Sequence, residues 1–180
     1  MKDEPVDTNS IQKIFGEKTF ETPPKCEKDP FYSEDLVRKS YVDTSGARIF
    51  NSMNQSIPRL EWKELLFDSV HYDTGEFYNP GTPSRLISVK DGVHIIVAHF
   101  EFAENSQGFR HGRLIVNSET IISQDFKAAY AGAPTPINTF SIWEFKAGDY
   151  IEVQAYQNSI STRSILATPH ISPELSIHRL

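Results

Sequence analysis

From Tyr41 onward the sequence consists of short apolar runs separated by turn-forming residues. The predicted strands cover residues 47–51, 61–70, 85–89, 93–103, 110–116, 120–126, 137–145, 150–157 and 173–180, with a further short piece near 164–167. No stretch shows a helical apolar period of useful length. Strands at this spacing indicate an all-β sandwich or jelly roll.

Alternation within the strands predicts which faces meet the core. In 150–156, Ile151, Val153 and Ala155 share one face, while Glu152 and Gln154 share the other. Because successive side chains of a strand point to opposite sides, this pattern is typical of a sheet with one face on a core.

Two other strands are apolar on both faces. In 93–103, one face carries Ile96, Ala98, Phe100 and Phe102, and the other carries Ile95 and Val97 before it becomes polar at His99 and Glu101. In 137–145, one face carries Phe140 and Ile142, and the other carries Ile137, Trp143 and Phe145. A two-layer sandwich offers each strand one inner face. We therefore expect another copy of the chain to cover the second face, and partial exposure is the alternative.

The first 41 residues form a different segment, rich in Lys, Asp, Glu and Pro. Such a segment cannot bury enough apolar surface to offset the entropy of ordering. Four of its large apolar residues, Ile11, Ile14, Phe15 and Phe20, predict an anchor that docks on something else. We therefore divide the chain into an extended anchoring arm (1–41) and a folded domain (42–180). The single cysteine, Cys26, excludes an intramolecular disulfide.

Charge and hydropathy exclude several partners. The chain of 180 residues has a net charge of -6, and no basic cluster suited to gripping phosphates occurs. The first ten residues are acidic and no apolar stretch follows them, so we expect no export signal. No apolar run approaches the ~20 residues that span a bilayer. Neither nucleic acid nor a membrane is an expected partner.

Several elements, in order, resemble the complement C1q-like (tumour-necrosis-factor-like) jelly roll in its bacterial and bacteriophage form. They are Asn54-Gln55-Ser56-Ile57-Pro58, Trp62, Phe67-Asp68, Tyr72-Asp73-Thr74, Ser84-Arg85-Leu86, Asp91-Gly92 and Ala147-Gly148-Asp149-Tyr150. The resemblance covers residues 42–180. It implies a ten-stranded jelly-roll sandwich that assembles as a tight trimer and serves as a head, tip or cap.

The sequence offers little for catalysis or cofactors. No recognised hydrolase, zinc-protease or phosphate-loop pattern occurs, and no cofactor is expected. His94 and His99, five residues apart, would point to opposite faces of one strand. Asp68, Asp73 and Glu76 are weak candidates for a hard-cation site. The favoured interpretation is turn chemistry, with Gly75 supplying a positive φ.

Aromatic residues raise a carbohydrate alternative. Tyr72, Phe77 and Tyr78 cluster in a predicted loop, where exposed rings could stack on sugars. The favoured interpretation is that these rings cover the end of the core or fill a trimer interface. Trp62 and Trp143 lie within strand patterns, and we expect them in the core or an interface.

These observations predict a non-enzymatic structural protein of a bacteriophage virion. The expected form is a trimeric head, such as a capsid decoration, head fibre or tail-fibre tip, which the arm attaches to capsid or tail subunits. The alternative is a glycan-binding adhesin or receptor-binding module on a phage or bacterial surface. A head on a bacterial cell or spore filament is less favoured because no collagen-like repeat occurs, and an enzyme is the remotest possibility.

Overall fold

The computed structural model describes residues 45–169 and 171–180, and all regular structure within them is β. The strands are β1 (Gly46–Phe50), β2 (Gln55–Ile57), β3 (Lys63–Glu64), β4 (Ser69–Asp73), β5 (Arg85–Ile87), β6 (Gly92–Phe102), β7 (Phe109–Val116), β8 (Thr120–Ala128), β9 (Thr135–Phe145), β10 (Tyr150–Gln157), β11 (Arg163–Ile165) and β12 (Glu174–Arg179). In this part of the chain, no helix is long and apolar enough to cross a membrane.

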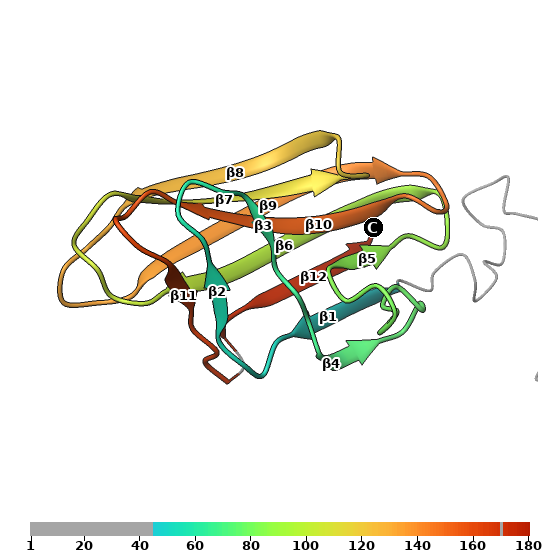
Figure 1. Ribbon diagram of the computed structural model, residues 1–180. Helices are drawn as coiled ribbons and strands as arrows, with labels where there is room; N and C mark the ends of the chain where they lie inside the picture. The colour runs from blue at the N-terminus through green and yellow to red at the C-terminus, as the bar shows by residue number, and fades with distance from the viewer. Residues whose placement is uncertain (1–44, 170) are drawn as a thin grey trace, which may run out of the picture. The chain divides into compact units, whose positions relative to one another are not determined.

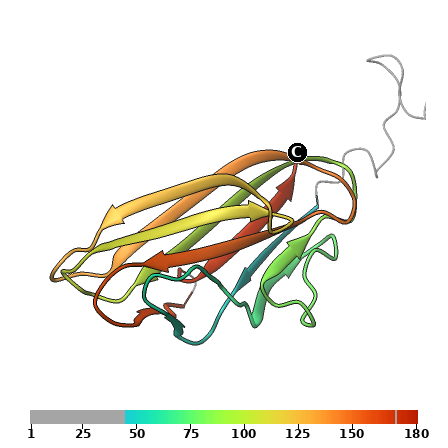
Figure 2. The ribbon, with the colours of Figure 1, turned by 45° about the horizontal axis from the view of Figure 1, so that its top comes forward.

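The strands form two antiparallel sheets that pack as two layers (Figures 1 and 2). In sheet A, β6 pairs with β9 on one side and with β12 on the other, and β1 and β4 follow β12. The short strands β11 and β2 extend sheet A from the end of β6. In sheet B, β10 lies between β7 and the short strands β3 and β5, and β8 forms the opposite edge. The predicted all-β jelly-roll sandwich is confirmed.

The core lies between the sheets and follows the predicted alternation. Ile96, Ala98, Phe100 and Phe102 of β6 are buried against residues such as Ile151 of β10. Gly112 of β7 faces the same layer, and a Cβ built on it would lie 2.6 Å from Cζ of Phe100 and against Cγ2 of Ile137. The close packing of the core at this position therefore requires glycine.

Two local predictions need correction. The single strand expected over 61–70 is divided, because its backbone leaves sheet B after β3 and joins sheet A at β4. Leu65 and Phe67 stay buried while they cross between the layers. Glu76, not Gly75, has the positive φ (57°) in the following turn. Gly75 is needed for space, since a Cβ there would lie 2.9 Å from Cβ of Ser45 and collide with the Phe77 ring.

The predicted arm (1–41), with Ile11, Ile14, Phe15 and Phe20, lies outside the described residues, as does Cys26. Its anchoring role stays a prediction.

We expect Gly112→Ala to destabilise the domain by about 1–3 kcal/mol, because a methyl group would overpack the contact between Phe100 and Ile137. The matched control is Gly81→Ala, whose Cβ would meet only the side chain of Asn79, at 3.2 Å, and which should change stability by less than about 0.5 kcal/mol. Urea unfolding of both variants measures the difference. Equal stability of the two variants would contradict this account of the core.

Candidate functional site

The outer face of sheet A carries a contiguous group of exposed apolar side chains, here called the apolar patch. It consists of Val93, Ile95 and Val97 of β6 and Phe140 and Ile142 of β9. Ile95 lies opposite Ile142 and Val97 opposite Phe140 in the β6–β9 register. Phe140 is 73% exposed and Ile142 is 62% exposed. Contiguous apolar side chains on a sheet face are typical of an interaction surface.

A polar group borders the apolar patch on the β12, β1 and β4 side. Nη2 of Arg48 donates to Oε2 of Glu174 at 2.5 Å, and Nε2 of His71 lies 3.2 Å from Oε1 of the same carboxylate. The His71 ring stacks on Phe50 with a centroid distance of 4.3 Å. Glu174 therefore has partners for both oxygens, and this border needs no external charge to satisfy it.

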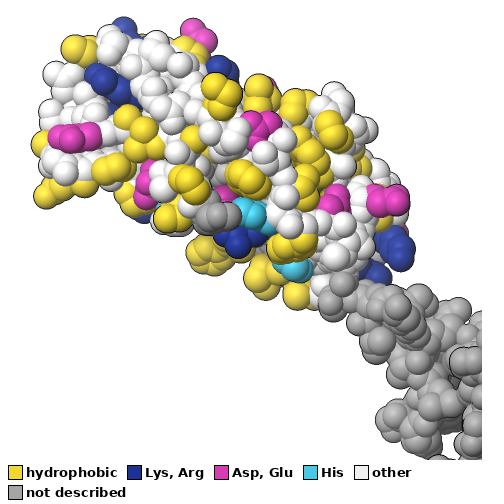
Figure 3. All heavy atoms as spheres, turned by 90° about the horizontal axis from the view of Figure 1, so that it is seen from below, with side chains coloured by type: hydrophobic (Ala, Val, Ile, Leu, Met, Phe, Trp, Pro, Cys, Tyr) yellow, Lys and Arg dark blue, Asp and Glu magenta, His cyan; other side chains and the backbone are white. Residues whose placement is uncertain are grey.

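His178 lies between the apolar patch and this polar group. It is opposite Ile95 on β6 and opposite Gly46 on β1. A Cβ at Gly46 would collide with the imidazole, so the glycine leaves room for the ring. Nε2 of His178 is 2.5 Å from the Tyr72 hydroxyl. Hydrophobic side chains likewise lie next to histidine and basic side chains in the view from below (Figure 3).

His99 follows the apolar patch along β6, on the same outer face. Its Nδ1 is 2.6 Å from Oδ1 of Asn138, and its Nε2 is 3.8 Å from Oε1 of Glu101. Nε2 is buried without a hydrogen-bond partner among the described residues. His94 points into the core and is 1% exposed. The prediction that these two histidines point to opposite faces is confirmed.

The three aromatic residues proposed for glycan stacking do not form one exposed group. Phe77 is 1% exposed and packs in the core, so its ring has no free face for a sugar. Tyr78 is partly buried, and its hydroxyl donates to the carbonyl of Phe67 at 2.5 Å. Tyr72 lies on the outer face of sheet A beside His178. Phe77 and Tyr78 therefore cover the core, as the favoured interpretation expected.

The weak cation candidates act in turns. Oδ1 of Asp73 accepts from the backbone N–H groups of Gly75 and Phe77, and Oδ2 accepts from that of Tyr78. Oδ2 of Asp68 accepts from the Ser52 hydroxyl at 2.6 Å. In residues 45–169 and 171–180, no three His, Cys, Asp or Glu side chains form a group that could hold a metal ion.

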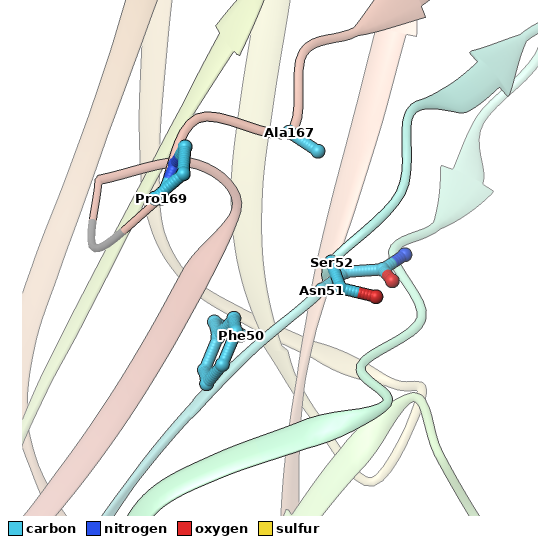
Figure 4. Close-up of a pocket in the computed structure, with 5 residues that line it drawn as sticks. All are labelled: Phe50, Asn51, Ser52, Ala167 and Pro169. Carbon is cyan, nitrogen blue, oxygen red and sulfur yellow. The ribbon is translucent and has the colours of Figure 1, made fainter.

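A small pocket of about 120 Å³ lies between the end of β1 and the segment after β11 (Figure 4). Its described lining residues are Phe50, Asn51, Ser52, Ala167 and Pro169. The volume is well below the roughly 300 Å³ of a typical small-molecule site. None of these five side chains is an acid or a base, so the described lining offers no general acid or base.

Sequence reasoning located much of the apolar patch but not the surroundings of Trp62. Trp62 precedes β3, is partly exposed, and packs against His111 and Tyr156 on the outer face of sheet B. It is therefore not a core residue. Trp143 of β9 is 37% exposed. Periodicity within one strand does not reveal contacts between side chains about 50 or more positions apart.

Comparison with known proteins supports the fold. A scan against models of protein families found no match, and a search of curated proteins also found none. Among solved structures, murine APRIL matches 77% of this chain and 100% of its own, with TM-score 0.61 and 11% identity. Eiger TNF from S. frugiperda matches 76% of this chain and 91% of its own (TM-score 0.55, 12% identity).

The globular domain of zebrafish complement 1qA is a third similar structure. It matches over 76% of this chain and 96% of its own, with TM-score 0.52 and 10% identity. Identities this low show the fold alone. The described domain is a C1q/TNF-like jelly roll.

We expect acid to destabilise the domain through His94. Burial lowers the pKa of His94, against the hydrogen bond to the Gly92 carbonyl that raises it. The unfolded chain would take up a proton below about pH 6.5. Stability from this group is therefore complete above pH 6.5 and is lost as the pH falls toward the folded-state pKa.

Urea unfolding at pH 7 and pH 5 should show a smaller loss of stability in His94→Gln than in the unmodified chain. Burial also lowers the pKa of His111, so His94→Gln combined with His111→Gln should flatten the dependence further. An unchanged pH dependence in the double variant would contradict this assignment.

Proposed function

We propose that this chain is a non-enzymatic structural protein of a bacteriophage particle. In this proposal, residues 42–180 form one head of a homotrimer, and the N-terminal arm attaches the trimer to capsid or tail subunits. A capsid decoration, a head fibre and a tail-fibre tip all fit this description. The C1q/TNF-like fold and the resemblance of the sequence to the phage form of that fold support the proposal.

The apolar patch is the observation that carries the homotrimer. Its five side chains are partly exposed in the single chain, and covering them would contribute on the order of 1 kcal/mol each. The bordering polar groups of Arg48, His71 and Glu174 already satisfy one another. An apolar centre with a satisfied polar border is the usual composition of a protein–protein interface.

The position of the apolar patch favours a ring of copies. The patch includes β9, which pairs with β6 and forms an edge of sheet A. The edge of one copy can then pack on the outer face of the next. Such head-to-tail contacts close into a ring when the rotation allows it. The family resemblance implies that the ring holds three copies.

We expect the unmodified protein to be a trimer at micromolar concentration and Phe140→Glu to dissociate it, because a buried carboxylate would lack a partner. The matched control is Phe126→Glu, which introduces the same charge in place of an exposed aromatic side chain on sheet B and should leave the trimer intact. Native mass spectrometry gives the mass of each. A stable monomer of the unmodified chain, or equal assembly of the two variants, would contradict the proposed interface.

We expect removal of residues 1–41 to leave the trimer intact but to abolish its attachment to particles. Ile14→Asp with Phe15→Asp should have the same effect in the full chain, because both side chains belong to the proposed anchor. Co-sedimentation with particles made from the genome that encodes the chain measures attachment. Full attachment of the shortened trimer would rule out the anchoring role of the arm.

A further inference from the structure

The outer face of sheet B carries a second unusual surface. Phe126 of β8, His111 of β7 and Tyr156 of β10 lie in one row across the three strands. Phe109 lies two residues before His111 on β7, on the same side, and Trp62 packs beside the row. We call these five side chains the aromatic surface. The solvent-facing side of an antiparallel sheet is ordinarily polar.

The rings of the aromatic surface hold one another in place. Trp62 lies 4.8 Å from His111 and 5.2 Å from Tyr156, measured between ring centroids. Phe109 lies 4.5 Å from Phe126 and 5.8 Å from Tyr156. Phe126 nevertheless remains 58% exposed. The group thus forms a preorganised apolar surface at least one ring of which faces solvent.

Arg113 adds a positive charge to one side of the aromatic surface. Its guanidinium lies over the Trp62 ring at 3.9 Å, and its Nε and Nη2 both donate to Oε1 of Gln154, at 2.8 and 2.6 Å. Glu64 accepts from Nε2 of the same amide at 3.4 Å. Within the described residues, no carboxylate forms an ion pair with Arg113, and Nη1 has no acceptor.

Partial burial of a cation that has no carboxylate partner among the described residues is costly. Desolvation lowers the pKa of Arg113, which means that the surroundings do not compensate fully for the water that the guanidinium has lost. A bound carboxylate would supply the missing counter-charge and could accept from Nη1. The nearby amides of Gln124 and Gln154 flank Arg113 in the register and can bond hydroxyl groups.

These features match one ligand chemistry. A pyranose ring has an apolar face of C–H groups that can pack on aromatic rings, and hydroxyl groups at its edge that bond to amides. We propose that the aromatic surface binds a glycan that carries a carboxylate, with the sugar packed on Phe126 and Trp62 and the carboxylate held by Arg113. This site lies on sheet B, so it does not rest on the trimer proposed for sheet A.

The first experiment uses the full chain on a glycan array that presents sialylated and uronic-acid glycans beside their neutral counterparts. We expect carboxylated glycans to bind and their neutral counterparts to bind more weakly. The best ligand is then titrated by calorimetry as a soluble oligosaccharide, both as the free acid and as its methyl ester. Absence of binding on the array, or equal binding of acid and ester, overturns the proposal.

Variants then test the individual roles. Phe126→Ala should weaken binding of acid and ester alike by about tenfold, as expected for loss of one aromatic contact. Arg113→Gln should remove the preference for the acid over the ester. The matched controls are Met53→Ala, an exposed side chain in the loop between β1 and β2, and Lys90→Gln in the loop before β6, and both should bind like the unmodified chain.

Thermal unfolding of each variant shows whether it is folded. If Arg113→Gln does not fold, Trp62→Phe serves as the second variant, because it keeps an aromatic ring under Arg113. It should bind the acid more weakly while it retains the preference over the ester. Unchanged binding in Phe126→Ala and in the folded Arg113 or Trp62 variant overturns the assignment of the site.

Discussion

The long strand β6 is the constraint on which the architecture depends. Its eleven residues pair with β9 along their whole length and with β12 over six positions. The two-residue period of the strand places Ile96, Ala98 and Phe100 in the core and Ile95 and Val97 outside. A register shift of one residue would exchange these sets, but both are apolar. The two registers are nevertheless unequal, because only the observed one buries His94 and keeps the mostly buried His99 beside Asn138.

The two sheets differ in what they present to solvent. Sheet A presents aliphatic side chains and Phe140 beside polar groups that hydrogen-bond to one another, a composition suited to permanent burial. Sheet B presents aromatic rings beside an arginine without a carboxylate partner in the described domain, a composition suited to a polar, charged ligand. Because the two surfaces are on opposite sides of the sandwich, assembly through one leaves the other accessible.

The sequence was sufficient to predict features that depend on local period. Alternation identified the core-facing sides of β6, β9 and β10 and most of the apolar patch, but it did not indicate that Glu152 and Gln154, on the outer face of β10, are also buried. It failed between 61 and 70, because the apolar period of Leu65 and Phe67 continues while the backbone changes sheets. The N–H of Leu65 donates to the Val153 carbonyl in sheet B, whereas that of Asp68 donates to the Phe50 carbonyl in sheet A. Such a change of hydrogen-bonding partner between the sheets does not alter the hydrophobic pattern of the sequence.

The aromatic surface could not be predicted for a related reason. Trp62, His111 and Tyr156 come from segments far apart in the sequence, and each is unremarkable in its own strand pattern. Conversely, Phe77 and Tyr78 are neighbours in sequence, but their rings pack against the core, and the Asp73 carboxylate accepts from the backbone N–H groups of both residues. Local clustering of aromatic residues is therefore a weaker indicator of a binding surface than cross-strand register.

Both outer surfaces retain groups that reduce the stability of the single chain. The apolar patch leaves Phe140 and Ile142 in water, and the aromatic surface contains a partly desolvated guanidinium that has no carboxylate partner among the described residues. Glu152, on the same outer face of sheet B, is a buried charge that does have partners. That carboxylate is 1% exposed and is satisfied by Ser84, Arg85 and Ser118. Glu152 and Arg113 both lie on the outer side of sheet B, but only Glu152 has an oppositely charged partner among the described residues, and Arg113 instead lies over the partly exposed Trp62 ring. Departures from local optimisation of this kind concentrate at functional sites. The Arg113 guanidinium, which has no carboxylate partner in the described domain, is therefore the feature on which the proposed ligand site of sheet B rests.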